Sequence, residues 1–269
     1  MRLARSRHNE GVPPTITLLT DFGLHDAYAG VLHGVIRRIA PDACVIDLCH
    51  QVPAQDVEAG AFLLMTAFSY FPAGTIHMAV VDPGVGTARR IVAVRAGDFT
   101  FLGPDNGVLR WAVDRAGPIE RMVSVEAPAY RLPRVSQTFH GRDIMAPAAA
   151  FLAQGVPLEA LGPPVAALAG RPFPQPARLA GAVHGEVLYI DHFGNAITNL
   201  PPEPGTVEVA GHRLPQRRAY GEAAPGEALA LAGSSGFLEV AVRNGSAAAQ
   251  LGLHRGLPVT LWLEERSRP

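Results

Sequence analysis

The chain has 269 residues, of which 48% are hydrophobic and 17% are charged, and its formal net charge is −1. A chain of this length and composition can bury one large core or two smaller ones. It has no long basic run and no lysine, so we expect no nucleic-acid partner and exclude Schiff-base chemistry on a lysine side chain.

The N-terminal segment, residues 1–14, is typical of a disordered polar arm and lacks the apolar core of a signal peptide. No apolar stretch approaches the about 20 residues that a membrane-spanning helix needs, so we expect no membrane partner. The two cysteines, Cys44 and Cys49, form neither a metal-ligand spacing nor a disulfide framework. Reduced thiols of this kind favour a cytoplasmic protein.

Strands and helices alternate along residues 15–109. The run "TITLLTDFG" predicts a buried strand that ends in a polar loop, and "DAYAGVLHGVIRRIAP" has apolar residues at helical spacing. The pattern continues through "ACVIDLCH", "DVEAGAFLLMTAFSYFP", "GTIHMAVVDPGVG" and "RRIVAVRAGDFTFLGPDNGVL". This alternation predicts an α/β domain over residues 15–170, with a mostly parallel sheet flanked by helices. Loops after such strands form sites, and Asp21, Asp82 and Asp105 fall in them.

The stretch "TFHGRDIMAPAAAFLA" combines polar side chains with an apolar run. We expect a helix over residues 144–153, with Pro147 in its first turn and Asp143 as its cap. Arg142 is expected to pair with a carboxylate. Capping and pairing leave His140 without a role in the structure of this segment.

Proline, glycine and alanine crowd the stretch "LGPPVAALAGRPFPQPARLAG". We place a linker there, at residues 171–180. Beyond it, short strands separated by turns, with no long helix between them, predict a smaller all-β domain over residues 181–269, a barrel or a sandwich.

Carboxylates and imidazoles in the polar loops make a dinuclear metal site one interpretation. Its ligands would come from Asp21, His50, Asp82, Asp105, His140 and Asp143. Arginines near these carboxylates, namely Arg89, Arg90 and Arg142, would neutralise them and compete with a divalent cation, so we expect no metal. The turn "DPGVG" also lacks the Gly-Lys-Ser/Thr of a phosphate-binding loop, and "DFG" stands without the other kinase motifs.

Taken in order, the polar motifs resemble those of one family. "ITLLTDFG", "HQVPAQDVEAGAFLL", "VDPGVGTARR", "FLGPDNGVL", "TFHGRDIMAPAAA" and "IDHFGNAITNL" closely resemble the S-adenosyl-L-methionine (SAM) hydroxide adenosyltransferases, which are adenosine-forming SAM hydrolases related to the fluorinase and chlorinase. The resemblance covers residues 15–265. It implies a homotrimer that binds SAM where one subunit's N-terminal domain meets a neighbour's C-terminal domain. It implies no cofactor, since SAM is the substrate and adenosine and methionine are the products.

The resemblance also implies a catalytic Asp-Arg-His triad, which by motif position is Asp82, Arg89 and His140. The triad would activate water against C5′ of the SAM ribose, and the sulfonium would leave as a neutral thioether. His140 would take the proton of the water, Asp82 would orient the water or the imidazole, and Arg89 would balance the charge of Asp82. Which of the three finally accepts the proton stays open at this point.

Substrate contacts follow from the same resemblance. The implied substrate-binding residues are Asp21, Phe22, Gln55, Asp191, Phe193, Asn195, Ser234, Ser235 and Arg243. Asp21 would accept hydrogen bonds from the ribose hydroxyls. Asp191 would bind the methionine ammonium, and the two serines would bind the methionine carboxylate. Phe193 and Asn195 would supply an aromatic face and an amide for adenine, and Arg243 would lie in a segment whose backbone contacts adenine. Gln55 stands where the halogenases have a tryptophan and would border the methionine chain.

Two other activities are weighed against hydrolysis. A halogenase must hold a desolvated halide, and an ionised Asp82 would repel that halide at a cost on the order of several kcal/mol. A non-catalytic binder of SAM or adenosine would use Asp21, Phe193 and Asn195 but has no need for the triad. Hydrolysis is therefore the predicted function.

Overall fold

The computed structural model describes residues 13–264, so most of the predicted arm, residues 1–12, lies outside the described residues. The chain divides into two compact units, with the boundary between Phe173 and Pro174. We call them the N unit and the C unit and describe each by itself. None of the helices within residues 13–264 combines the length and the apolar character that crossing a bilayer requires.

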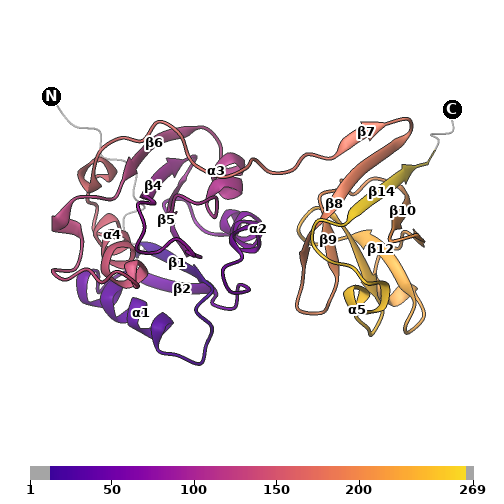
Figure 1. The fold of residues 1–269 in the computed structure, drawn as a ribbon, viewed down its shortest axis with the longest axis horizontal. Helices are drawn as coiled ribbons and strands as arrows, with labels where there is room; N and C mark the ends of the chain where they lie inside the picture. Colours follow the sequence, from indigo (N-terminus) through magenta and orange to yellow (C-terminus); the bar gives the residue numbers. More distant parts are fainter. Residues whose placement is uncertain (1–12, 265–269) are drawn as a thin grey trace. The chain divides into compact units, whose positions relative to one another are not determined.

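Six strands form one sheet in the described part of the N unit (Figure 1). They are β1 (Thr15–Thr20), β2 (Cys44–Cys49), β3 (Ile76–Val80), β4 (Ile91–Ala96), β5 (Phe99–Pro104) and β6 (Ile119–Ser124), in the order β2-β1-β3-β5-β4-β6. Strands β2, β1, β3 and β5 run parallel, whereas β4 pairs antiparallel with β5 and β6. The predicted α/β fold class with a mostly parallel sheet is confirmed.

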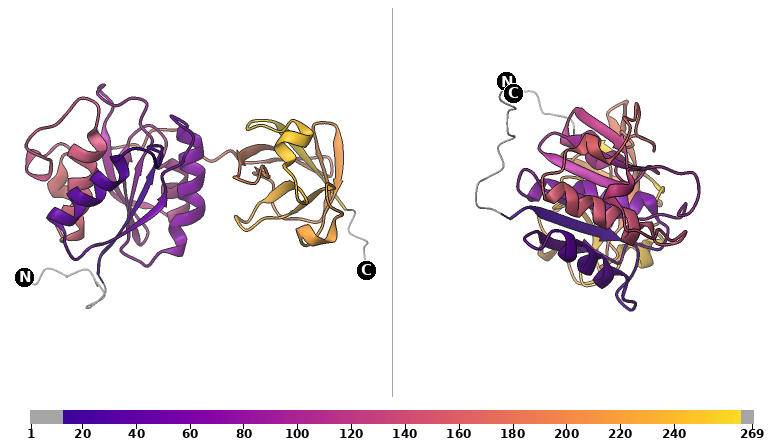
Figure 2. Two further views of the ribbon diagram at one scale, coloured as in Figure 1. Left: turned by 90° about the horizontal axis from the view of Figure 1, so that it is seen from below. Right: turned by 90° about the vertical axis from the view of Figure 1, so that its left-hand side faces the viewer.

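Helices cover both faces of this sheet (Figure 2). They are α1 (Tyr28–Ile39), α2 (Val57–Ala67), α3 (Arg110–Ala116) and α4 (Ala146–Ala153), with short 3₁₀ turns at Phe68–Tyr70, Pro128–Tyr130 and Leu158–Leu161. Helix α1 packs against α4, and α2 packs against α3. Between α1, α4 and the sheet lies a core of fully buried side chains such as Leu18, Leu32 and Met78.

The segment after His140 differs from its prediction. A π-helical turn, Gly141–Met145, precedes α4, and Pro147 lies in the first turn of α4, where a proline is tolerated. The buried carboxylate of Asp143 accepts from the backbone N–H of Ser136, 2.8 Å away, and not from a helix N–H. The predicted cap is therefore wrong, because the π-helical turn places Asp143 against the preceding loop. Arg142 does pair with a carboxylate, since its Nε and Nη2 donate to both oxygens of Asp143.

The C unit is a nearly closed antiparallel barrel. Its strands are β7 (Ala177–Leu179), β8 (Ala182–Ile190), β9 (Ala196–Thr198), β10 (Gly205–Val209), β11 (His212–Pro215), β12 (Ala228–Ala232), β13 (Leu238–Val242) and β14 (Pro258–Leu263). They follow the order β11-β10-β14-β8-β9-β13-β12, with β7 on β8, and a bridge between Gln216 and Ala230 links the two ends. A 3₁₀ turn (Tyr220–Glu222) and α5 (Ala247–Leu251) complete the unit. Strand β7 lies within residues 171–180, the stretch expected to be the linker.

Candidate active site

Asp82 and Arg89 are joined through the turn that follows β3. Nε of Arg89 lies 2.8 and 2.9 Å from the two carboxylate oxygens of Asp82, and Nη2 lies 2.5 Å from Oδ2. Both side chains are well shielded, with exposed fractions of 6% for Asp82 and 12% for Arg89. A charge-assisted, forked contact of this kind fixes the carboxylate plane and balances its charge.

His140 completes a chain of three groups. Nη2 of Arg89 lies 2.9 Å from Nδ1 of His140. A guanidinium has no acceptor, so Nδ1 must accept this hydrogen bond, and the neutral ring carries its proton on Nε2. Burial and the nearby charge of Arg89 lower the pKa of His140, which keeps the imidazole neutral. The structure therefore brings Asp82, Arg89 and His140 together, with the cation in the middle.

A cavity of about 220 Å³ opens beside this chain of groups. Its walls are formed by Asp21, Phe22, Gln55, Val80, Asp82, Pro83, Val85, Thr138, Phe139, His140 and Gly141. Five of the residues singled out from the sequence thus face one space, namely Asp21, Phe22, Gln55, Asp82 and His140. Arg89, which contacts Asp82 and His140, is not part of this lining.

The loop after β1 supplies another carboxylate to this cavity. The backbone N–H of Gln55 donates to Oδ2 of Asp21 at 2.8 Å, and Gln55 holds a left-handed backbone with φ of 67°. This contact leaves Oδ1 of Asp21 for a ligand. The Phe22 ring meets Phe139 edge-on, with 5.6 Å between ring centroids, which closes one wall with apolar surface.

The two loops that carry the triad touch through their backbones. Gly86 has φ of +79°, and a Cβ added there would lie 2.5 Å from the carbonyl oxygen of Gln137. Only glycine tolerates both that conformation and that approach. The turn that bears Asp82 and Arg89 is thereby held against the loop that leads into His140.

In the C unit, Asp191 organises the turn between β8 and β9. Its Oδ1 accepts from the N–H groups of Phe193 and Asn195, and Oδ2 accepts from the side-chain amide of Asn195 at 3.0 Å. The amide of buried Asn195 is therefore oriented, with its own oxygen left for a ligand. The Phe193 ring is 72% exposed, which is unusual for a large apolar side chain.

The predicted carboxylate-binding serines lie between β12 and β13. Oγ of Ser235 is buried and has no hydrogen-bond partner among the described residues, which suits a hydroxyl that waits for a ligand. Ser234 is exposed. Arg243 turns its guanidinium to the carbonyls of Gly221 and Ala223, so its side chain braces a neighbouring loop.

Two residues near Asp191 were not anticipated. The Tyr220 hydroxyl donates to Glu239, which is 5% exposed on β13. Burial and the charge of Asp191 raise the pKa of Glu239, although the Tyr220 hydrogen bond opposes this. The carboxyl groups of Asp191 and Glu239 are thus close enough in the C unit to influence each other electrostatically. The signal in the sequence is a lone acidic residue inside the apolar run "FLEVAV".

The alternative dinuclear metal site is not assembled. Asp105 binds Arg90, and Asp143 binds Arg142, as Asp82 binds Arg89. Each of these three carboxylates is thus engaged by a guanidinium, and Asp105 and Asp143 are absent from the cavity lining. His50 lies in another group of side chains, described below.

Models of the SAM hydroxide adenosyltransferase N-terminal and C-terminal domains match residues 16–162 and 185–260. The (R)-S-adenosyl-L-methionine hydrolase of Thermus thermophilus is 47% identical over 91% of this chain and 98% of its own length. A crystal structure of an uncharacterized conserved protein from Thermotoga maritima superposes with a TM-score of 0.85 at 35% identity, over 91% of this chain and 99% of that one. A fluorinase of Nocardia brasiliensis is more distant, at 29% identity over 71% of this chain and 72% of its own. The chain belongs to the SAM hydroxide adenosyltransferase family.

Proposed function

We propose that the protein hydrolyses SAM to adenosine and L-methionine. A water oxygen attacks C5′ of the ribose, the C5′–S bond breaks, and its electron pair leaves with sulfur as a neutral thioether. The neutral thioether needs no acid to leave, and the one proton that the water loses passes to a base. The observation that carries this proposal is the hydrogen-bonded chain Asp82–Arg89–His140, two members of which face the cavity.

The hydrogen bonds favour a different role for each of the three residues. Nδ1 of His140 accepts from Arg89 and Nε2 carries the proton, so the neutral imidazole has no lone pair to offer the water. Asp82 lines the cavity, and its two oxygens, which accept from Arg89, keep lone pairs for a water molecule. In this proposal Asp82 orients the water and receives its proton, while His140 positions Arg89 and Arg89 positions Asp82. This differs from the expectation that His140 takes the proton.

The cavity suits the ribose of the substrate, and the C unit suits its adenine and methionine ends. Asp21 keeps one carboxylate oxygen for the ribose hydroxyls, with Phe22 and Gln55 beside it. Phe193 offers an exposed ring and Asn195 an oriented amide for adenine, and Gly194 between them lies against Ser246, three residues after Arg243. Asp191, with Glu239 near it, attracts the methionine ammonium, and the hydroxyls of Ser235 and Ser234 donate to the methionine carboxylate.

We further propose a homotrimer in which the N unit of one subunit and the C unit of its neighbour share each substrate. The exposed Phe193 ring supports this, because it presents an apolar surface that a ligand or a neighbouring subunit would cover. A cytoplasmic location is proposed from the two free thiols, Cys44 and Cys49. No cofactor enters the reaction, since each carboxylate of the candidate metal set lies against an arginine or serves the ribose.

Hydrolysis is favoured over halogenation by the same carboxylate. Asp82 lines the cavity and is 6% exposed, so its charge acts through little water. A halide there would meet a like charge, whereas a water molecule finds an acceptor. The relatives named as hydrolases are also more similar to this chain than the fluorinase is.

Product analysis tests the proposal. The relatives' name specifies the (R) form, and L-methionine already fixes the α-carbon, so we read the descriptor as the configuration at sulfur. The protein is incubated separately with the (R) and (S) sulfonium forms, with and without chloride and a chelator, and the products are separated by chromatography. We expect adenosine and methionine, faster from the (R) form, with no 5′-chloro-5′-deoxyadenosine and no effect of the chelator.

Variants locate the reaction. Asp82→Asn and His140→Ala are expected to lower adenosine release by about 10²–10³-fold or more while retaining nucleoside binding. Asp98→Asn and His212→Ala, at exposed positions that do not belong to the cavity lining, are matched controls that should keep full activity. Unchanged release in both triad variants would refute the role of the triad.

A further inference from the structure

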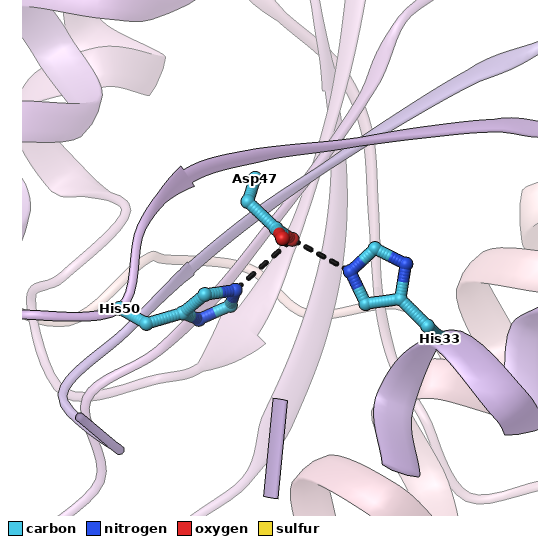
Figure 3. A group of neighbouring side chains, drawn as sticks. All are labelled: His33, Asp47 and His50. Carbon is cyan, nitrogen blue, oxygen red and sulfur yellow. Dashed lines mark hydrogen bonds and ion pairs between the residues drawn. The ribbon is translucent and has the colours of Figure 1, made fainter. Parts of the chain in front are cut away.

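We propose that the N unit carries a binding site for a borderline divalent cation such as Zn²⁺, formed by His33, Asp47 and His50 and separate from the catalytic cavity. The three side chains come from α1, from β2 and from the residue that follows β2, and Figure 3 shows them converging on one point. None of them belongs to the cavity lining. We call this group the imidazole–carboxylate cluster.

The donor atoms lie at distances that suit metal coordination. Nε2 of His33 is 2.8 Å from Oδ1 of Asp47, and Nε2 of His50 is 3.0 Å from the same oxygen. All three donor atoms lie within 4.8 Å of one another. Around a tetrahedral ion with bonds of about 2.0–2.2 Å, neighbouring ligand atoms stand about 3.3 Å apart, so small side-chain shifts admit an ion between them.

His50 gives an independent indication of a ligand. Its side chain is 3% exposed, and its Nε2 points into the cluster without the alignment of a hydrogen bond to any described residue. Its other nitrogen, Nδ1, lies 2.8 Å from the Thr20 hydroxyl. In the tautomer with the proton on Nδ1, Nε2 offers its lone pair, and a cation held between Nε2 and Asp47 takes the place of the proton that Nε2 carries in the other tautomer. A second hydrogen bond that orients the ring is typical of metal-binding histidines.

The composition of the cluster selects the class of ion. Two imidazoles and one carboxylate suit Zn²⁺, Co²⁺ or Ni²⁺ better than Mg²⁺ or Ca²⁺, which prefer oxygen ligands. No arginine pairs with Asp47 in the described residues, in contrast to Asp82, Asp105 and Asp143. The side chains of His33 and Asp47 are 37% and 44% exposed, so an ion can enter from solvent and keep water in its remaining positions.

The cluster is connected to the substrate loop. Thr20, which holds His50, precedes Asp21, and the backbone carbonyl of His50 accepts from the N–H of Gly23 at 2.7 Å. An ion bound to His50 would therefore steady the loop that carries Asp21. This second effect rests on the proposed function, whereas metal binding itself does not.

Cobalt titration tests the site directly. Protein freed of metal by a chelator is titrated with Co²⁺, and the visible absorption of the bound ion and the heat of binding are recorded. We expect one Co²⁺ per chain, displaced by Zn²⁺. His33→Ala changes a partly exposed helix position and is expected to weaken Co²⁺ binding at least 100-fold without unfolding the protein, and Asp47→Asn should do the same.

His212→Ala and Asp98→Asn are the matched controls, and both should bind Co²⁺ as the unaltered chain does. Cys44 and Cys49 remain in every variant, so binding through the thiols would survive His33→Ala. Failure to bind Co²⁺, or equal binding by His33→Ala, would overturn the proposed site. Either result would leave adenosine formation unaffected, so the failure of this site is distinguishable from the failure of the proposed function.

Discussion

The N unit contains two three-membered groups built from similar parts. In the catalytic triad a guanidinium stands between a carboxylate and an imidazole, so the order is Asp82, Arg89, His140. In the imidazole–carboxylate cluster a carboxylate stands between two imidazoles, so the order is His33, Asp47, His50. The charge of the central group is opposite in the two cases.

That central charge decides what each group can bind. A fixed cation in the triad balances the carboxylate, repels metal ions and leaves hydrogen bonds to orient water. A central carboxylate flanked by two imidazoles offers one negative charge and two nitrogen ligands to a cation. Similar residue types therefore support opposite chemistry, and the position of one arginine is the difference.

Removing the central cation of the triad should have the largest effect. Arg89→Met keeps the side-chain volume but leaves Asp82 and His140 without their shared donor, so we expect hydrolysis to fall by about 10²–10³-fold. Residual activity should also become sensitive to Zn²⁺, because the carboxylate and imidazole then face each other without a cation. Initial rates with and without Zn²⁺ measure both effects.

Arg90→Met is the matched control, since Arg90 also pairs with an aspartate, Asp105, but lies outside the triad. It should retain most activity. Full activity in Arg89→Met would show that the central cation is dispensable.

His77 shows what a buried histidine does with no carboxylate beside it. Burial lowers its pKa from 6.5 to about 4. Between these two pKa values the unfolded chain binds a proton at His77 and the folded chain does not. The folded state is therefore fully stable with respect to His77 above about pH 6.5 and loses stability as the pH falls toward 4. We expect a loss of about 3 kcal/mol in the free energy of unfolding from this residue alone.

Denaturant titrations at pH 7 and pH 4.5 measure this loss. In His77→Gln the stability should depend less on pH, whereas the exposed variant His212→Gln should follow the unaltered chain. Parallel pH profiles for the His77 variant and the unaltered chain would contradict the assignment.

The pH dependence of hydrolysis should show a smaller effect, about tenfold per pH unit. The lowered pKa of His140 keeps it neutral, and protonation would place an imidazolium against the guanidinium of Arg89. Activity should therefore persist at pH 6.5 and fall only below the pKa of His140. A profile of kcat/KM against pH measures this, and an acidic limb centred above 6.5 would count against a neutral His140.

Much of the N unit was predictable because strand and helix periodicities alternate clearly there. The catalytic groups follow from the fold, since loops at the carboxyl ends of parallel strands share one edge, and Asp21 and Asp82 come after β1 and β3. The order of the motifs along the chain is enough to indicate the family from the sequence alone. The roles of the individual substrate residues remain proposals.

Other features depend on details that periodicity does not contain. The imidazole–carboxylate cluster needs the register of β1 on β2, which shifts at an irregularity between Leu18 and Leu19 and brings Thr20 beside His50. The partner of Asp143 was missed because a π-helical turn rotates it away from α4. Glu239 lies on a strand that is buried throughout, so alternation does not mark it.

The contact between Gly86 and the carbonyl of Gln137 bears on how this enzyme tolerates mutation. Any side chain at position 86 would push the turn that bears Asp82 and Arg89 away from the loop that leads into His140. The three triad side chains would then be misaligned although none of them has changed. The lineage can thus lose its activity through a residue that never meets the substrate. The hydrogen atom that glycine carries there in place of a side chain is as much a condition of catalysis as the three groups of the triad.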